Sequence, residues 1–291
     1  MPNDNPRTNH IFARHVAPFA PLALALAMNT APTKPTSSSS SRALPSSHRA
    51  SRSGGGGGGS FVLPASCSLP FNGTENPDID TRCPINGGGS SAAKQAQSRA
   101  KNNLCAATGQ PLRMTYQDFI AKQKKADSLN VTNLPDRSPL AALGEGTYVE
   151  YFAFIQDAHY SDVSSGEAVN CNIPGDSTND IHIVLVQDPN DDPCSSTTAE
   201  MIPHFRPAAW TDTNVDSVKD HPVRVRGPLF YDDAHKPCSG TSRPSPNRVS
   251  VWEIHPVYSL DVCRQSDLAQ CQNSTDSADW ISLEDWLKQT Q

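Results

Sequence analysis

The sequence predicts a mainly β fold: a small OB-like barrel of five or six strands, with a Cys-containing, partly helical extension before it and a helix after it. From Leu143 onward, apolar strand patterns alternate with long polar loops. One helical pattern falls between the third and fourth long strands, whereas the crossover helices of a parallel sheet are missing. Only 36% of the residues are hydrophobic and 25 are prolines, so we expect many turns and little helix.

Composition divides the chain into five parts. The first 60 residues are rich in Pro, Ser and Gly, and such a segment cannot bury enough apolar surface to offset the entropy of ordering it. The expected parts are a signal-like segment at 1–31, a disordered linker at 32–60, the Cys-containing extension at 61–139, the barrel at 140–265 and a tail with a short helix at 266–291.

The N-terminal segment has the order of a secretory signal. Arg7 and Arg14 precede a short apolar stretch at 16–28, and small residues follow it. A disordered Ala-rich tail is the alternative, which Pro18 and Pro21 favour. The apolar stretch is too short to span a bilayer as a helix. We therefore expect a secreted or periplasmic protein without a membrane span.

The cysteines agree with export. All eight lie after residue 60 and none forms a C-x-x-C pair, which argues against zinc ribbons and thioredoxin-like redox chemistry. Disulfide bonds in an oxidising compartment explain them better. Many connectivities are open, and the sequence predicts only the local pair Cys263–Cys271. Asn72, Asn130 and Asn273 begin N-x-S/T triplets, which matter only in a eukaryotic secretory route.

The charge disfavours nucleic acid as a partner. The net charge of −6 understates the acidity of the part expected to fold, because the first 59 residues carry six bases and one acid. An acidic surface repels a phosphate backbone, and Lys122, Lys124 and Lys125 fit a solvated helix face better than a binding patch. The expected partner is an extracellular ligand or protein of unknown identity.

Helices are predicted in the extension and at the C-terminus. Residues 90–103 are rich in Ala, Lys, Gln and Arg, and Thr115 caps a second helix that ends at Lys125 with Phe119–Ile120 facing inward. Residues 128–139 should form a loop. At the C-terminus a helix packing on the barrel is expected, with a partner-binding helix as the alternative, because four residues share one helical face: Trp280, Leu283, Trp286 and Leu287.

The barrel region opens with the longest strand pattern, at 147–158. Both faces of this strand are apolar, which indicates a core on one side and a cover on the other. One face holds Val149, Tyr151, Ala153 and Ile155, and the other holds Tyr148, Phe152 and Phe154. The remaining strands are expected at 168–173, 180–187, 199–205, 222–231 and 248–262, with a short helix at 212–219.

Several characteristic segments follow one another along the chain: Ala100-Lys-Asn-Asn-Leu-Cys-Ala, Gly166-Glu-Ala-Val-Asn-Cys, Asp180-Ile-His-Ile-Val-Leu, Val223-Arg-Val-Arg-Gly, Leu229-Phe-Tyr-Asp-Asp-Ala-His and Trp252-Glu-Ile-His-Pro-Val. In this order they resemble a family of uncharacterised bacterial exported proteins with an OB-like barrel and a WEIHP-type motif. The resemblance covers roughly residues 80–265 and implies the fold and export, but no activity, cofactor or site residue.

Acids and histidines recur on neighbouring predicted strands. Asp180/His182 and Glu253/His255 are each two apart, so alternation places both members of a pair on one face of a strand. Such groups can bind a divalent metal or act as acid and base, but buried acid–histidine pairs often serve structure alone. Pro256 indicates an edge or a bulge, and bulges are frequent beside sites. The other candidates are Glu200 and His204, which share a face if 199–205 is extended, and His235, which follows Asp232 and Asp233.

Two functions remain open at this point. One is an exported, disulfide-stabilised binding or interaction module without chemistry of its own. The alternative is a metal-dependent hydrolase that uses His182, His255 and nearby carboxylates. The sequence contains no G-x-S-x-G elbow, H-E-x-x-H helix or P-loop, so no known motif favours an enzyme.

Overall fold

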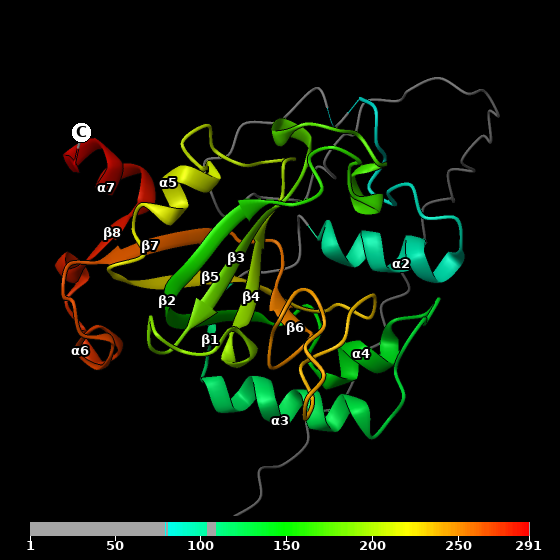
Figure 1. Ribbon diagram of the computed structural model, residues 1–291, viewed down its shortest axis with the longest axis horizontal. Helices are drawn as coiled ribbons and strands as arrows, with labels where there is room; N and C mark the ends of the chain where they lie inside the picture. The colour runs from blue at the N-terminus through cyan, green and yellow to red at the C-terminus, as the bar shows by residue number, and fades with distance from the viewer. Residues whose placement is uncertain (1–78, 80, 104–108, 291) are drawn as a thin grey trace, which may run out of the picture. The chain divides into compact units, whose positions relative to one another are not determined.

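The computed structural model describes residue 79, residues 81–103 and residues 109–290 (Figure 1). The predicted signal-like segment and linker, together with Asn72, Cys67 and Cys105, lie outside these residues. The described part is mainly β and contains a closed five-stranded barrel, which confirms the predicted fold class.

The barrel closes because β2 pairs with β3 along one edge and with β5 along the other. The strand order is β2-β3-β4-β6-β5, in which β4 and β6 pair in parallel and the other four pairings are antiparallel. This order, with a short helix between β4 and β5, is that of an OB-like barrel. The strands are β2 (Tyr148–Tyr160), β3 (Ile181–Val186), β4 (Thr197–Met201), β5 (Pro222–Tyr231) and β6 (Trp252–Ile254).

Three further strands extend the sheet at its two ends. β1 (Leu112–Met114) pairs in parallel with β2, while β7 (Ser259–Cys263) pairs with β5, and β8 (Trp280–Ser282) pairs with β7. The helices are α2 (Ala92–Lys101), α3 (Tyr116–Asp127), α4 (Ser138–Leu143), α5 (Asp212–Asp216), α6 (Leu268–Asn273) and α7 (Leu283–Thr290). Short 3-10 turns are η1 (Ala168–Asn170), η2 (Asp176–Thr178), η3 (Pro193–Ser195) and η4 (Ser277–Asp279).

Local sequence signals explain β2 and α3. Thr115 caps α3 as predicted, since its side chain accepts from the Asp118 amide, and the buried Phe119 ring packs edge-on against Tyr151 at 5.0 Å. The opposite face of β2 is covered, because Phe152 packs against Trp280 at 5.4 Å. All four residues predicted on one face of β2 lie in the main core: Val149, Tyr151, Ala153 and Ile155.

Residues 168–173 do not form the predicted strand. They contain η1, after which Cys171 and Asn172 have φ angles of 57° and 55°. Left-handed backbone cannot continue a strand, and a disulfide bond to Cys83 holds this turn from a distant part of the sequence. A local apolar pattern contains no information about that bond, so the prediction was wrong.

Two other strand predictions had wrong bounds. The strand expected at 199–205 is β4, which ends at Met201 because Pro203 has no N–H to extend the ladder. The strand expected at 248–262 is two strands, β6 and β7, separated by the cis bond between His255 and Pro256. The interruption predicted at Pro256 is therefore present.

The C-terminal helix begins later in the sequence than predicted. α7 begins at Leu283, and Trp280 instead belongs to β8, whose backbone pairs with β7. Leu283 and Leu287 are buried, and the Trp286 ring lies 4.5 Å from that of His221. These contacts are those of a helix packed on the barrel. The short helix α6 had no predicted counterpart.

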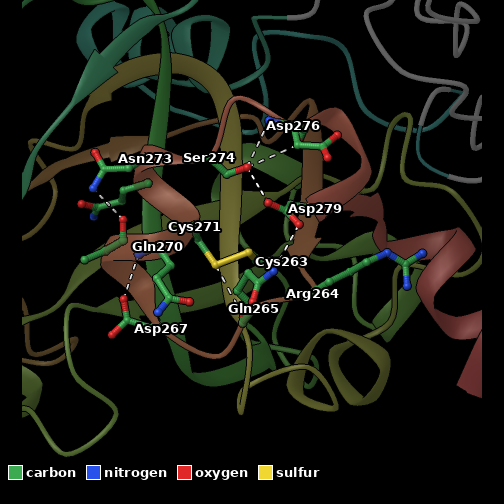
Figure 2. The surroundings of a disulfide bond; sticks show 12 residues. Cys263, Arg264, Gln265, Asp267, Gln270, Cys271, Asn273, Ser274, Asp276 and Asp279 are labelled. Atoms are coloured by element: carbon green, nitrogen blue, oxygen red, sulfur yellow. Dashed lines mark hydrogen bonds between the residues drawn. A yellow bond between two sulfur atoms is a disulfide. The ribbon is translucent and has the colours of Figure 1, made fainter.

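Three disulfide bonds cross-link the described residues: Cys83–Cys171, Cys194–Cys238 and Cys263–Cys271. The last confirms the predicted local pair, and Figure 2 shows it beside α6, with Ser274 bonded to Asp279 nearby. Such bonds persist in an oxidising environment. Within the described ranges, the helices are all too short or too polar to cross a membrane.

Residue 227 of β5 must be glycine, because the end of β6 and the chain that follows it pass directly against this position. A Cβ at this position would lie 2.2 Å from the Pro256 carbonyl oxygen and 2.7 Å from Ile254 Cγ2. We expect Gly227→Ala to lower the free energy of unfolding by about 3 kcal/mol through this overpacking, measured by urea denaturation. Gly146→Ala is the control, because its Cβ meets nothing within 4 Å and only its φ of +83° costs about 1 kcal/mol. Equal losses would contradict a steric requirement at Gly227.

Candidate functional site

Most of the predicted polar residues gather on the outer side of the barrel, beneath α2 and the loop that contains η1. Ala199 and Met201 point into the main core, so the intervening Glu200 points outward from β4. The same alternation turns His182 and Glu253 outward from β3 and β6. These three side chains are nevertheless largely buried, because the helix and the loop cover this side. Charged groups in such a setting need partners.

Glu200 is the centre of the cluster. Its Oε2 lies 2.8 Å from His255 Nε2 and 3.0 Å from Lys101 Nζ, and its Oε1 lies 3.3 Å from His182 Nε2. His182 and Glu200 are directly opposite each other in the β3–β4 ladder. Burial alone would raise the pKa of Glu200, but these three positive groups hold it well below its ordinary value. Glu200 is therefore an anion that links three cationic side chains.

His255 donates hydrogen bonds from both ring nitrogens. Nδ1 bonds to the Lys101 carbonyl at 2.8 Å, and Nε2 lies 3.2 Å from Asp180 Oδ2 in addition to its contact with Glu200. Burial disfavours the imidazolium, but the Glu200 charge and the bonds to both carboxylates outweigh it and raise the pKa of His255 to about 10. His255 is thus protonated at neutral pH.

His182 lies between two carboxylates. Its Nε2 is 3.3 Å from an oxygen of Glu167 and 3.3 Å from one of Glu200. Burial lowers the pKa of His182, but the two acids raise it to about 9. The other Glu167 oxygen accepts from the Asp180 amide at 3.1 Å, which connects the loop before η1 to the start of β3. The cluster therefore joins the loop to the barrel.

A second group of charges surrounds Arg248. Its Nη1 donates to Glu253 Oε2 at 2.7 Å, and its Nη2 donates to Asp232 Oδ2 at 2.5 Å. His235 Nδ1 donates to the same Asp232 oxygen at 2.5 Å. Burial, reinforced by two neighbouring carboxylates, raises the pKa of Glu253 to about 7 despite its bond to Arg248. Burial would raise the pKa of Asp232 too, but its cationic partners hold it well below the ordinary value.

A cavity of about 420 Å³ lies beside both groups. One wall is the α2 face that carries Lys94, Gln97, Ser98 and Lys101, at the i, i+3, i+4 and i+7 spacing of a helix face. The other walls come from the loop around η1 and from the residues that follow β5. The other residues lining it are Gly89, Asn133, Asp162, Gly166, Glu167, Ala168, Val169, Asn172, Asp232, Asp233, Ala234 and His235.

The structure brings most predicted site residues together but changes their pairing. Asp180 contacts His255 rather than His182, and Glu253 contacts Arg248 rather than His255. Residues two apart on a strand are about 6–7 Å apart, so their side chains find closer partners on neighbouring segments. The predicted acid–histidine pairs within each strand were therefore wrong.

Of the two other histidines predicted for the site, His235 belongs to it and His204 does not. His235 lines the cavity and bonds to Asp232. His204 lies in the turn after β4, where its ring is 6.4 Å from that of Phe205, so the extended face that it was expected to share with Glu200 does not form.

Three members of the site were not predicted from the sequence: Lys101, Glu167 and Arg248. Lys101 and Arg248 are buried, whereas long cationic side chains usually reach water. For Arg248 a signal existed, since it begins the apolar run that leads into β6. Lys101 and Glu167 lie in segments whose composition is typical of exposed residues. They are buried only because α2 and the loop around η1 cover this side of the barrel.

Comparisons of the chain with protein-family models, with curated proteins and with solved structures found no match. The chemistry of the site must therefore follow from its own geometry. The cavity offers ammonium, amide and hydroxyl donors on α2 and carboxylate acceptors on the facing loops. Buried ion pairs beside the cavity hold several of these groups in place, so the arrangement is suited to orienting a small polar molecule.

Proposed function

We propose that the protein is an exported binding module that holds a small polar extracellular ligand in the cavity beside α2. The observation that carries this proposal is the cavity itself, because buried ion pairs hold some of its charged wall residues, including Lys101 and Asp232. Its volume lies in the range of ligand pockets. The three disulfide bonds, the signal-like N-terminus and the resemblance to exported OB-like proteins support export to the cell exterior or periplasm.

The wall chemistry indicates the class of ligand. Two lysines and four acids face the cavity with several amides, and the described residues that line it include no Phe, Tyr or Trp. This lining complements a ligand with several hydroxyl groups or with charges of both signs, such as a saccharide or a short peptide. Because the walls are already fixed by ion pairs, binding needs little reordering of side chains.

The hydrolase hypothesis has less support. It requires a metal ion held by His182, His255 and nearby carboxylates to reach a substrate, and neither histidine belongs to the described residues that line the cavity. Both imidazoles are instead engaged with carboxylates, at 3.3 Å and 2.8 Å from Glu200. An OB-like barrel by itself implies no activity.

The proposal is tested by filling the cavity without changing its charges. Ala168 lines the cavity on η1, so we expect Ala168→Trp to abolish ligand binding. The probes are saccharides, amino acids and dipeptides at millimolar concentration, detected by saturation-transfer NMR on the full chain. Ala142→Trp, on an exposed residue of α4, is the matched control and should keep the signal. Probes that bind neither protein, or that bind Ala168→Trp as well as the unaltered chain, would contradict the proposal.

A further inference from the structure

We propose that Asp180, Glu200 and His255 form a binding site for one divalent transition-metal ion, with Zn²⁺ as the best-matched ion. Each residue offers one ligand atom, and the three atoms lie within 4.8 Å of one another. His255 Nε2 is 2.8 Å from the Glu200 oxygen and 3.2 Å from the Asp180 oxygen. Ligand atoms in a tetrahedral zinc site are about 3.3 Å apart, so only small side-chain movements are needed.

A shell of hydrogen bonds orients all three ligands, and this is the independent sign of a metal site. The Lys101 carbonyl accepts from His255 Nδ1 at 2.8 Å, which directs Nε2 toward the carboxylates. Asn170 Nδ2 donates to the second Asp180 oxygen at 3.0 Å, and His182 lies 3.3 Å from the second Glu200 oxygen. Metal-binding histidines and carboxylates are typically held in this way.

Positive charge already occupies the place that the ion would take. The ammonium group of Lys101 lies 3.0 Å from Glu200 Oε2, the same oxygen that His255 Nε2 contacts at 2.8 Å. A divalent cation supplies positive charge beside the same carboxylate. Lys101 also lines the cavity, so an ion that displaced its ammonium group would face the cavity on that side. Lys101 is thus a competitor for the ion and not a ligand.

The ligand set selects among metals. One imidazole and two carboxylates suit Zn²⁺ and Mn²⁺, whereas Mg²⁺ and Ca²⁺ prefer sites built from oxygen alone. This inference goes beyond the proposed function, because it rests on the buried cluster and requires no ligand in the cavity. The two proposals can therefore fail separately.

The test is calorimetric titration of the chelator-treated full chain with ZnCl₂, MnCl₂ and MgCl₂. We expect saturable binding of one Zn²⁺ or Mn²⁺ per chain and none of Mg²⁺. Glu200→Gln and Asp180→Asn should each weaken binding at least about tenfold, as the loss of metal-site partners does. Lys101→Met should bind as tightly as the unaltered chain or more tightly. His159→Gln is the control: His159 bonds to Asp157 at 2.7 Å in an exposed acid–histidine pair.

Several results would overturn the proposal. They are the lack of saturable Zn²⁺ and Mn²⁺ binding, unchanged affinity in Glu200→Gln, loss of binding in His159→Gln, and a large loss in Lys101→Met. Circular dichroism checks that each variant is folded. If the carboxylate variants do not fold, X-ray absorption of the zinc-loaded unaltered chain decides. One imidazole with oxygen neighbours supports the site, and two or more imidazoles exclude it.

Discussion

Replacing Arg248 by methionine should lower the free energy of unfolding by about 3–5 kcal/mol, the cost of leaving a buried charge without its partner. Arg248 is 1% exposed, and its guanidinium bridges Glu253 and Asp232, which are 0% and 2% exposed. Methionine fills a similar volume, so the loss is electrostatic rather than the result of a cavity. Asp232 bears most of the effect, because its pKa lies well below the ordinary value and it stays ionised.

The measurement is urea denaturation of the full chain at neutral pH, followed by tryptophan fluorescence. Arg243→Met is the matched control. Arg243 likewise donates from two nitrogens, in this case to the single carboxylate of Asp192, but the two side chains are 51% and 54% exposed. Solvent screens such a pair, so its loss should cost less than about 1 kcal/mol. Similar losses in the two variants would show that the Arg248 bridge contributes no more than a surface ion pair.

A double variant separates the bridge from the packing. Arg248→Met combined with Glu253→Gln removes one of the two acids that Arg248 leaves behind. If unpaired charge is the main cost, this double variant should be more stable than Arg248→Met alone. A further loss of stability would instead indicate that Glu253 has a favourable role independent of Arg248.

The sequence predicted those features of the fold and the site that depend on local patterns. Local signals were sufficient where the interactions are local: Thr115 capped α3, and the alternation in β2 gave its core face. They were also sufficient to place Asp180, His182 and His255 near one another, because strands of one small barrel lie side by side. Patterns with a period of two or of 3.6 residues carry this information.

The sequence did not predict which side chains contact one another within the site. Which acid contacts His255 depends on the β3–β4 register and on where Asp180 ends the preceding loop, and neither is encoded locally. Lys101 is buried only because α2 packs over the barrel, so its role follows from tertiary structure. The turn at 168–173 is a similar case, since a distant cysteine holds it. Non-local contacts therefore account for the errors in both the fold and the site.

The Cys83–Cys171 bond should be the most stabilising of the three disulfide bonds in the described part of the chain. It joins residues 88 apart in sequence, whereas Cys263 and Cys271 are 8 apart. In the chain-entropy account, the longer loop contributes about 4–5 kcal/mol and the shorter one about 2–3 kcal/mol. Replacing both cysteines of a pair by alanine should therefore cost about 2 kcal/mol more at Cys83–Cys171, as measured by urea denaturation. An equal or smaller loss there would contradict this expectation.

Loss of the Cys83–Cys171 bond should also disturb the cavity, whereas loss of the Cys263–Cys271 bond should not. Cys171 directly follows η1, so its disulfide bond to Cys83 holds the loop at η1 against the segment that leads into α2. The Gly88 amide, which donates to the Ala168 carbonyl at 2.7 Å, joins the same two segments. Both segments contribute residues that line the cavity. A probe that binds the unaltered chain should lose its saturation-transfer signal in Cys83→Ala/Cys171→Ala and keep it in Cys263→Ala/Cys271→Ala, at a temperature where both variants are folded. Equal signals in the two variants would mean that the remaining contacts between η1 and α2 suffice to hold the cavity walls.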